Sequence, residues 1–300
     1  MIILENENLN IPNNLNVYCC KDCGFKYLTQ INASIPCVHC GGELILKDDI
    51  NYRLPDYVIP FQTDKDSVIK NFKKMLRGRF FIPKSIRKIE NIGNIIGLYL
   101  PYWSYDFEVN GDILFEANNV EYWKDANFKY KKVDSYLIKK NGHFDFKEVI
   151  LQACSNEILK NRNLLEPFDY SGLVPFVSSY LSNYCSVFCD INDVTVLNKI
   201  RGSINSLSVK MIEDTIATKE KKIVENDMVV MTNNEKLMLL PVWLISFKYK
   251  DVDYSFFMNG QTGKFVGEKF PVGIREIVIL SIVVFCLLFL IGFCFVLFFM

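Results

Sequence analysis

The sequence is poor in histidine, and several common catalytic motifs are missing. Only two histidines occur among 300 residues, and neither forms an H-E-x-x-H motif or accompanies a recognisable serine or cysteine nucleophile. The stretch "GQTGK" at 260–264 lacks the glycine spacing of a phosphate loop, and Phe265 replaces the expected serine or threonine. We therefore predict that the protein is not an enzyme, with a pair among its scattered carboxylates as the remaining catalytic alternative.

An excess of one charge is also missing. The chain has 34 acidic and 34 basic residues, so no global field favours nucleic acid. The first ten residues, "MIILENENLN", lack the basic segment and the long apolar run that a signal peptide has. Half of the residues are hydrophobic, which is enough for a sizeable core.

Cysteine, by contrast, is concentrated in "YCCKDCGFKYLTQINASIPCVHCGG" at 18–42. Cys20-x-x-Cys23 and Cys37-x-x-Cys40 are two knuckles in which a tight turn can present both sulfurs to one metal ion. A glycine follows each pair and permits the bend. Four thiolates suit a closed tetrahedral Zn²⁺ shell, so we predict one structural zinc bound by these four cysteines.

Other uses of the cysteines remain as alternatives. A redox or disulfide role is the weaker interpretation if the thiols are kept reduced. Cys19 lies beside Cys20 and is a spare ligand that can substitute for it. His39, inside the second knuckle, is interpreted as a surface residue. Cys185 and Cys189 are interpreted as core thiols.

The C-terminal residues are strongly apolar. Residues 277–299 contain no charge, and a helix of this length spans about 35 Å, against roughly 30 Å for a hydrocarbon core. Lys264, Lys269 and Arg275 precede the segment. The expectation is a single-pass transmembrane helix in the cell membrane, with the N-terminal bulk cytoplasmic. A buried core helix is the alternative.

Residues 63–78 predict an amphipathic helix that stops at Gly78, within a basic stretch that continues to residue 88. Thr63 to Asp66 resembles a capping box, and apolar residues follow at helical spacing. Nine basic residues face one acid, Asp66, between 65 and 88. The simplest interpretation is a solvated face. The functional alternatives are contact with an anionic leaflet, through Lys70, Lys73, Lys74 and Arg77, or contact with nucleic acid.

An internal repeat organises the middle of the chain. "YLPYWSYDF" at 99–107 echoes "LLPVWLISF" at 239–247, and aromatic residues alternate along both segments, which is typical of half-buried strands. Asn110-Gly111 and Asn141-Gly142 are predicted hairpin turns, and residues 259–263 are a further predicted turn. Residues 170–188 and 191–220 carry helix-like apolar spacing and are expected to cover the sheet. The two tryptophans are expected to be core anchors rather than a ligand platform.

These features together resemble the bacterial TFIIB-type zinc-ribbon-containing proteins. The resemblance rests on the two knuckles, on "IPFQTDKDSVIKNFKKML", on "YLPYWSYDFEV", on "LEPFDYSGL" and on "LLPVWLISFKYKDVDYSFFMNGQTGKFVGE". It covers nearly the whole chain and implies a ribbon, two proline–tryptophan strands and a hydrophobic C-terminal segment. The sequence "SNYCSVF" departs from the family pattern by lacking a Gly-Phe after the predicted helix. The family implies no settled activity.

The expected architecture is therefore α+β. It comprises an N-terminal segment (1–16), a zinc ribbon (17–47), an antiparallel-sheet domain with two related Pro-Trp hairpin units and covering helices (48–272), and a transmembrane helix (277–299). The expected function is a non-enzymatic, membrane-anchored module that binds an unidentified protein partner. The alternative is a membrane-tethered nucleic-acid-binding protein.

Overall fold

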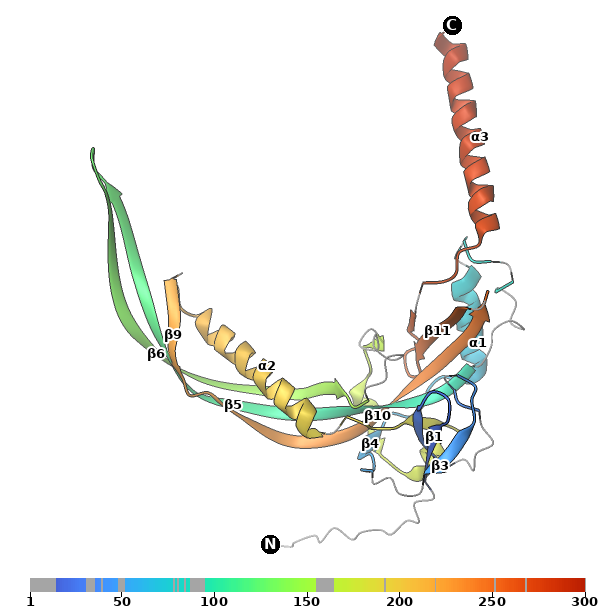
Figure 1. Ribbon diagram of the computed structural model, residues 1–300, viewed down its shortest axis with the longest axis horizontal. Helices are drawn as coiled ribbons and strands as arrows, with labels where there is room; N and C mark the ends of the chain where they lie inside the picture. Colours follow the sequence, from blue (N-terminus) through green and yellow to red (C-terminus); the bar gives the residue numbers. More distant parts are fainter. Residues whose placement is uncertain are drawn as a thin grey trace.

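The computed structural model (Figure 1) describes residues 15–30, 36–38, 40–47, 52–77, 79, 81–83, 85–86, 95–154, 165–191, 193–218, 220–250, 252–267 and 269–299. Its helices are α1 (Lys65–Arg77), α2 (Asp193–Glu213) and α3 (Ile274–Phe299), with two short 3-10 turns, η4 (Tyr170–Gly172) and η5 (Ser178–Leu181). Its strands are β1 (Asn16–Cys20), β2 (Lys26–Thr29), β3 (Leu44–Lys47), β4 (Tyr57–Val58), β5 (Ile95–Lys124), β6 (Lys129–Gln152), β7 (Val174–Pro175), β8 (Cys185–Val187), β9 (Glu220–Asn226), β10 (Val229–Tyr249), β11 (Val252–Asn259) and β12 (Phe265–Gly267).

All of these strands join one mixed sheet, which corrects the predicted fold class. The main path runs β12-β11-β10-β5-β8-β2-β1-β3. Off this path, β6 and β9 pair with β5, β4 pairs with β10, and β7 pairs with β4. The β4–β10 and β5–β8 pairs are parallel. The expectation of an antiparallel sheet was wrong, because two of its strand pairs are parallel. The three-residue strand β8 pairs with both β5 and β2 and joins the ribbon to the rest of the sheet.

The two Pro-Trp segments form the centre of the sheet. They pair antiparallel in β5 and β10, with Leu239 opposite Pro101 and Leu237 opposite Trp103. Both tryptophan side chains are buried, and each indole N–H donates a hydrogen bond, from Trp103 to the carbonyl of Ile191 and from Trp243 to the hydroxyl of Thr63. The prediction of core anchors is confirmed.

The predicted Asn-Gly turns are wrong. Gly111 and Gly142 lie opposite each other in the middle of the β5–β6 ladder, and the strands continue to a turn at 125–128. Gly111 is needed for the close approach of backbone instead, and Gly142 makes room for a side chain of α2. A Cβ at Gly111 would lie 2.4 Å from the carbonyl oxygen of Asp227, and a Cβ at Gly142 would lie 2.4 Å from Ile212 of α2. The predicted turn at 259–263 is confirmed, closed by a hydrogen bond from the amide of Gly263 to the carbonyl of Asn259.

Helix α1 forms where the sequence predicts it. The Asp64 carboxylate accepts the amide of Ser67 and caps the first turn, whereas the Thr63 hydroxyl bonds to the carbonyl of Gly260. Val68, Phe72 and Leu76 are buried on one face of the helix. This spacing follows the 3.6-residue period, and the face packs on β10, β11 and β12 through a cluster that includes Phe256 and Phe270.

The second predicted helical region is only partly helical. Residues 193–213 form α2, whose isoleucines pack on β5 and β6. Residues 170–188 form η4, β7, η5 and β8 rather than an α-helix. Pro175 lies in this stretch, and it cannot donate the hydrogen bond that a continuous helix needs there.

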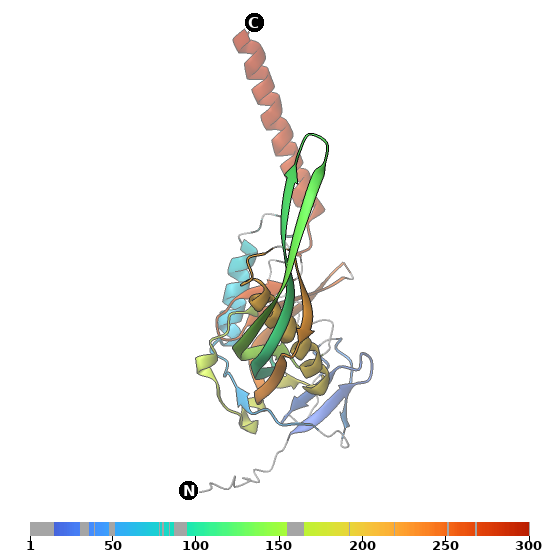
Figure 2. The same cartoon turned by 90° about the vertical axis from the view of Figure 1, so that its left-hand side faces the viewer.

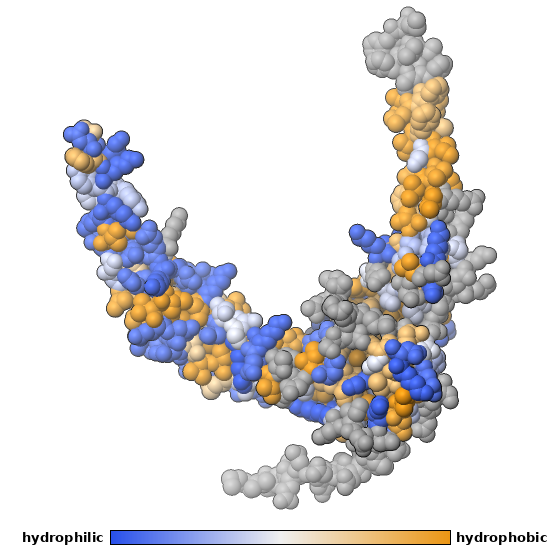
Figure 3. Space-filling model, in the orientation of Figure 1, coloured by the Kyte–Doolittle hydropathy of each residue, from blue (hydrophilic) through white to orange (hydrophobic). Residues whose placement is uncertain are grey.

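The prediction of a transmembrane helix over 277–299 is also corrected. Helix α3 contains these residues, and apolar side chains gather over it (Figure 3). Within the described part of the chain, no helix combines the length and the apolar character that a membrane crossing requires. The predicted cell-membrane location, the membrane partner and the lipid contact by Lys70, Lys73, Lys74 and Arg77 lose their support with it.

The molecule is drawn out by the β5–β6 hairpin. Residues 113–118 of β5 pair with β9 on the side opposite β6, and α2 lies over this part of the sheet. Beyond β9, residues 119–124 and 129–134 continue as a two-stranded ribbon that projects from the body (Figures 1 and 2). The hairpin tip and α3 lie at opposite ends of the curved sheet.

Candidate metal centre

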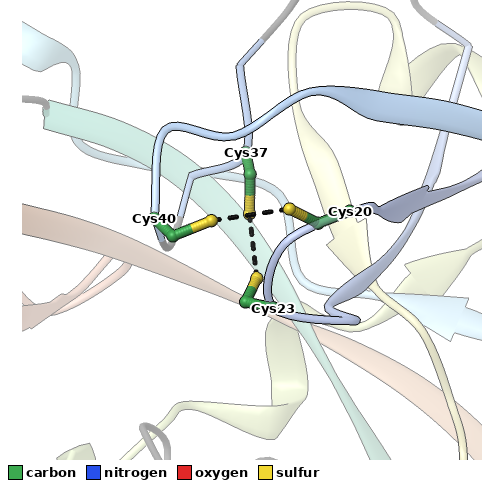
Figure 4. A group of neighbouring side chains, drawn as sticks. All are labelled: Cys20, Cys23, Cys37 and Cys40. Atoms are coloured by element: carbon green, nitrogen blue, oxygen red, sulfur yellow. Dashed lines mark hydrogen bonds between the residues drawn. The ribbon is translucent and has the colours of Figure 1, made fainter.

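The two cysteine knuckles come together at the end of the sheet. Cys20 is the last residue of β1, Cys23 lies in the turn before β2, and Cys37 and Cys40 form the turn before β3. β1 pairs with β2 and with β3 on its two sides. This pairing brings two turns that are distant in sequence to one place (Figure 4).

The four sulfurs face a common centre. The Sγ atoms lie within 4.8 Å of one another, with 3.4 Å between those of Cys20 and Cys40 and 3.5 Å between those of Cys23 and Cys37. A tetrahedral ion with metal–sulfur bonds of about 2.3 Å places its sulfurs roughly 3.8 Å apart. The four cysteines are therefore close enough to hold a metal ion, and the structure groups all four residues that the sequence predicts.

Backbone hydrogen bonds fix the shape of each knuckle. In the first, the amide of Gly24 donates to the carbonyl of Cys20 at 3.1 Å. In the second, the amide of Gly41 donates to the carbonyl of Cys37 at 2.8 Å. Gly24 and Gly41 have φ angles of 71° and 76°, which side-chain-bearing residues rarely adopt. The glycine of each knuckle is thus explained by its turn.

The thiols differ in their pKa. Burial raises the pKa of Cys20, but backbone amides of Cys23 and Asp22 and bonds with Cys40 and Cys23 outweigh burial and lower it to about 7. Burial and neighbouring thiols raise the pKa of Cys23, and burial is the main cause of the raised pKa of Cys40. Without a cation, closely packed thiols cannot all ionise, whereas a bound divalent ion favours the thiolate form of each ligand.

Cys19 lies outside the group of four. Its Sγ lies 3.7 Å from the carbonyl oxygen of Gly24, and its side chain is half-buried. Neighbouring residues of a strand point to opposite faces, which separates it from Cys20. His39 lies outside the described residues. Cys185 is buried in the core beside the ribbon, and Cys189 packs against the cluster under α2.

Tyr27 is a site residue that the sequence does not single out. Its ring is buried, and its hydroxyl lies 3.5 Å from the Sγ of Cys37. Burial, followed by the bond to Cys37, raises the pKa of Tyr27, so the phenol keeps its proton. A protonated phenol donates to a thiolate and supports ligation. The sequence does not single out Tyr27, because several aromatic residues lie near the knuckles. The contact with Cys37 becomes visible only in the folded ribbon.

A pocket of about 310 Å³ borders the group of four cysteines. It lies between the first knuckle and the strand β8, and it is lined by Cys23, Gly24, Lys26, Cys154 and Asp190 among others. Cys23 is the single member of the group of four in this lining. The pocket therefore meets the group of four cysteines at Cys23.

The second histidine and the Gly-rich turn show no catalytic arrangement among the described residues. His143 is an exposed residue of β6 that lies 3.7 Å from Asp145 and 4.0 Å from Glu108. The turn at 259–263 is held by Asn259, whose side-chain amide donates to the carbonyls of Leu165 and Pro167 and whose oxygen accepts the amides of Gln261 and Thr262. This turn joins two parts of the chain, which is a structural role.

The fold and the cysteines define a large mixed sheet that carries four cysteines close enough together to hold a metal ion. No protein-family model matches the chain, and no solved structure matches it. The chain is similar to the uncharacterized protein YdjG of Bacillus subtilis (strain 168), with 26% identity over 229 residues that cover 76% of this chain and 67% of YdjG. That name carries no activity to transfer.

Proposed function

We propose that the chain is a zinc-ribbon protein of the kind it resembles in sequence, the TFIIB-type zinc-ribbon-containing proteins, and that it serves as a non-enzymatic protein-interaction scaffold. The observation that carries the proposal is the convergence of four cysteine sulfurs within 4.8 Å. A four-thiolate shell suits Zn²⁺ and has no open position for a substrate or a reactive water. The metal then stabilises the ribbon, and the surface of the protein does the binding.

Metal analysis tests the zinc assignment. The full chain should carry one zinc ion per molecule, and the double variant Cys20→Ser/Cys37→Ser should lose it. Cys19→Ser is the matched control, because Cys19 is the neighbour of Cys20 but lies outside the group of four. Zinc retained by the double variant, or lost from Cys19→Ser, would refute the ligand set.

The scaffold role is tested separately from the metal. Crosslinking from native extracts should recover the same protein partner with the unchanged chain and with Cys19→Ser. The double variant should lose that partner if the ribbon forms part of the binding surface. An unchanged chain that acts on a substrate without any added protein would contradict a scaffold role.

Nucleic-acid binding is the second candidate, because one feature favours it. Lys65, Lys70, Lys74 and Arg77 are exposed on α1, and such clusters contact phosphate backbones. A mobility shift that weakens steeply with salt and disappears in Lys70→Gln/Lys74→Gln/Arg77→Gln would favour this candidate. The absence of any shift at low salt would leave the protein-binding scaffold.

A further inference from the structure

The outer edge of β6 is the longest unpaired strand edge in the described part of the chain. β6 pairs with β5 along one side, and no described strand pairs with its other side. Every residue from Lys129 to Leu137 is exposed. Unpaired edges are templates for another strand, and a two-stranded ribbon alone is marginally stable in water. The projecting ribbon therefore gains most from a third strand.

The usable part of this edge has two clear limits. At one end the strand begins at Lys129, directly after the tip turn. At the other end a bulge interrupts the ladder, where Lys147 and Glu148 lie between the pairs Phe107–Phe146 and Tyr105–Val149. Glu148 has a φ of 54°, so the strand bends there. The regular edge runs from Lys129 to Phe146, and its middle lies at residues 137–138.

We propose that two copies of the chain pair antiparallel along this edge, with Leu137 of one copy opposite Leu137 of the partner subunit. A two-fold axis then passes through Leu137, and each copy supplies the same surface. The two limits of the edge place the axis at residue 137 or 138, and the charge pairs of the edge favour Leu137. The twelve-stranded sheet becomes one continuous sheet across both copies.

This register places both aspartates of the edge opposite lysines of the partner subunit. Lys129 lies opposite the partner's Asp145, and Asp134 lies opposite the partner's Lys140. By symmetry each pair occurs twice. Moving the two-fold axis by one residue in either direction breaks these pairs. The move that places Lys132 opposite the partner's Lys140 also adds a repulsion. Opposite charges on facing strands stabilise pairing, and like charges destabilise it.

Exposed apolar side chains lie at the centre of the same register. Leu137 is 65% exposed and Tyr136 is 46% exposed. In the pair, Leu137 lies opposite Leu137 of the partner subunit on one face of the sheet. Tyr136 lies opposite the partner's Ile138 on the other face, which α2 covers. Tyr130 faces the partner's Phe144. The pairing thus covers apolar groups that β5 and α2 leave open to water.

A cysteine on the axis gives the sharpest test. Facing residues in an antiparallel pair have Cα atoms about 4.5–5.5 Å apart, which lies within the range of a disulfide. Full-length Leu137→Cys under mild oxidation should form a covalent dimer, and mass spectrometry should locate the link at 137–137. Tyr122→Cys is the control, because Tyr122 is 70% exposed but lies on β5. Dimer formation no greater than in the control and the unchanged chain would overturn the proposal.

Charge swaps test the register without a crosslink. Full-length chain in a mild detergent, which covers the exposed apolar side chains of α3, is studied by light scattering over a range of concentrations. Lys129→Asp and Asp145→Lys should each weaken the dimer about ten-fold, and the double variant should restore it to within about two-fold. Lys124→Asp makes the same charge change on β5 and should have little effect. A monomeric unchanged chain, or a dimer that none of the swaps weakens, would overturn the proposal.

Discussion

The two ends of the sheet are held together in different ways. At the end formed by β1, β2 and β3, four cysteines face inward, whereas Ile45 and Leu46 of β3 are exposed. At the end where α1 covers β10, β11 and β12, stacked aromatic rings are buried, including Phe72, Phe256 and Phe270. One end groups four possible metal ligands beside a small apolar core that includes Phe25 and Tyr27. The other uses apolar burial and needs no ligand.

Removal of the metal should have the largest effect and should change amide protection at one end of the sheet but not at the other. Metal binding to ribbon-like peptides has apparent free energies of about 10–16 kcal/mol, so a chelator should abolish amide protection in β1, β2 and β3. The amides of α1 and β10 should stay protected, because their core contains no metal ligand. Hydrogen exchange followed by mass spectrometry measures both ends at once. Equal loss at both ends would mean that the ends are not independent.

The opposite perturbation is Phe72→Ala. Phe72 is fully buried and touches three aromatic rings, so truncation should lower the free energy of unfolding by about 3–5 kcal/mol. Metal content should not change. Lys70→Ala, on the exposed face of the same helix, should stay within about 0.5 kcal/mol. Denaturant unfolding with zinc analysis checks both, and metal loss in Phe72→Ala would contradict the separation.

A smaller effect is expected at the junction that Asn259 makes. Its buried side chain bonds to two carbonyls near Leu165 and to two amides in its own turn. Asn259→Ala leaves these groups without their partner and should destabilise the fold by about 2 kcal/mol. Asn127→Ala, an exposed amide at the hairpin tip, is the control and should be near neutral. Equal effects in thermal unfolding would show that the junction has no stabilising role.

The smallest effect is expected in the projecting ribbon, which is held neither by the cysteine group nor by the buried aromatic cluster. Trp123 is 51% exposed and stacks on Tyr130 at 5.5 Å. Such a pair contributes about 0.5–1.5 kcal/mol, so Trp123→Ala should cost no more than about 1 kcal/mol. The buried Trp103 gives the comparison, since Trp103→Ala should cost about 3–5 kcal/mol. A loss at Trp123 as large as at Trp103 would show that the ribbon is part of the core.

The sequence predicts local features of this fold well and its connections poorly. The spacing of the cysteines and of Val68, Phe72 and Leu76 is set by local geometry, so the metal centre and α1 could be foreseen. The role of Asn110-Gly111 could not be foreseen, because Gly111 is required by a close contact with Asp227, which is far away in sequence. The joining of ribbon and sheet depends on β8, whose three residues carry no periodic signal. The predicted span at 277–299 is not supported, because no helix in the described part of the chain has the length and apolar character of a membrane crossing.

The length of β5 has a consequence for the order in which the chain folds. Its ladder with β6 closes through a short turn, so it can form while the remainder is still being synthesised. Its ladder with β10 pairs Asn110 with Val229 and Ile95 with Ile245, and it must wait for residues made much later. Contacts between distant residues form slowly. Until they form, Tyr105 and Phe107 lack the neighbours that bury them in the finished sheet. Newly made chains should therefore pass through a stage in which these exposed apolar residues can bind chaperones.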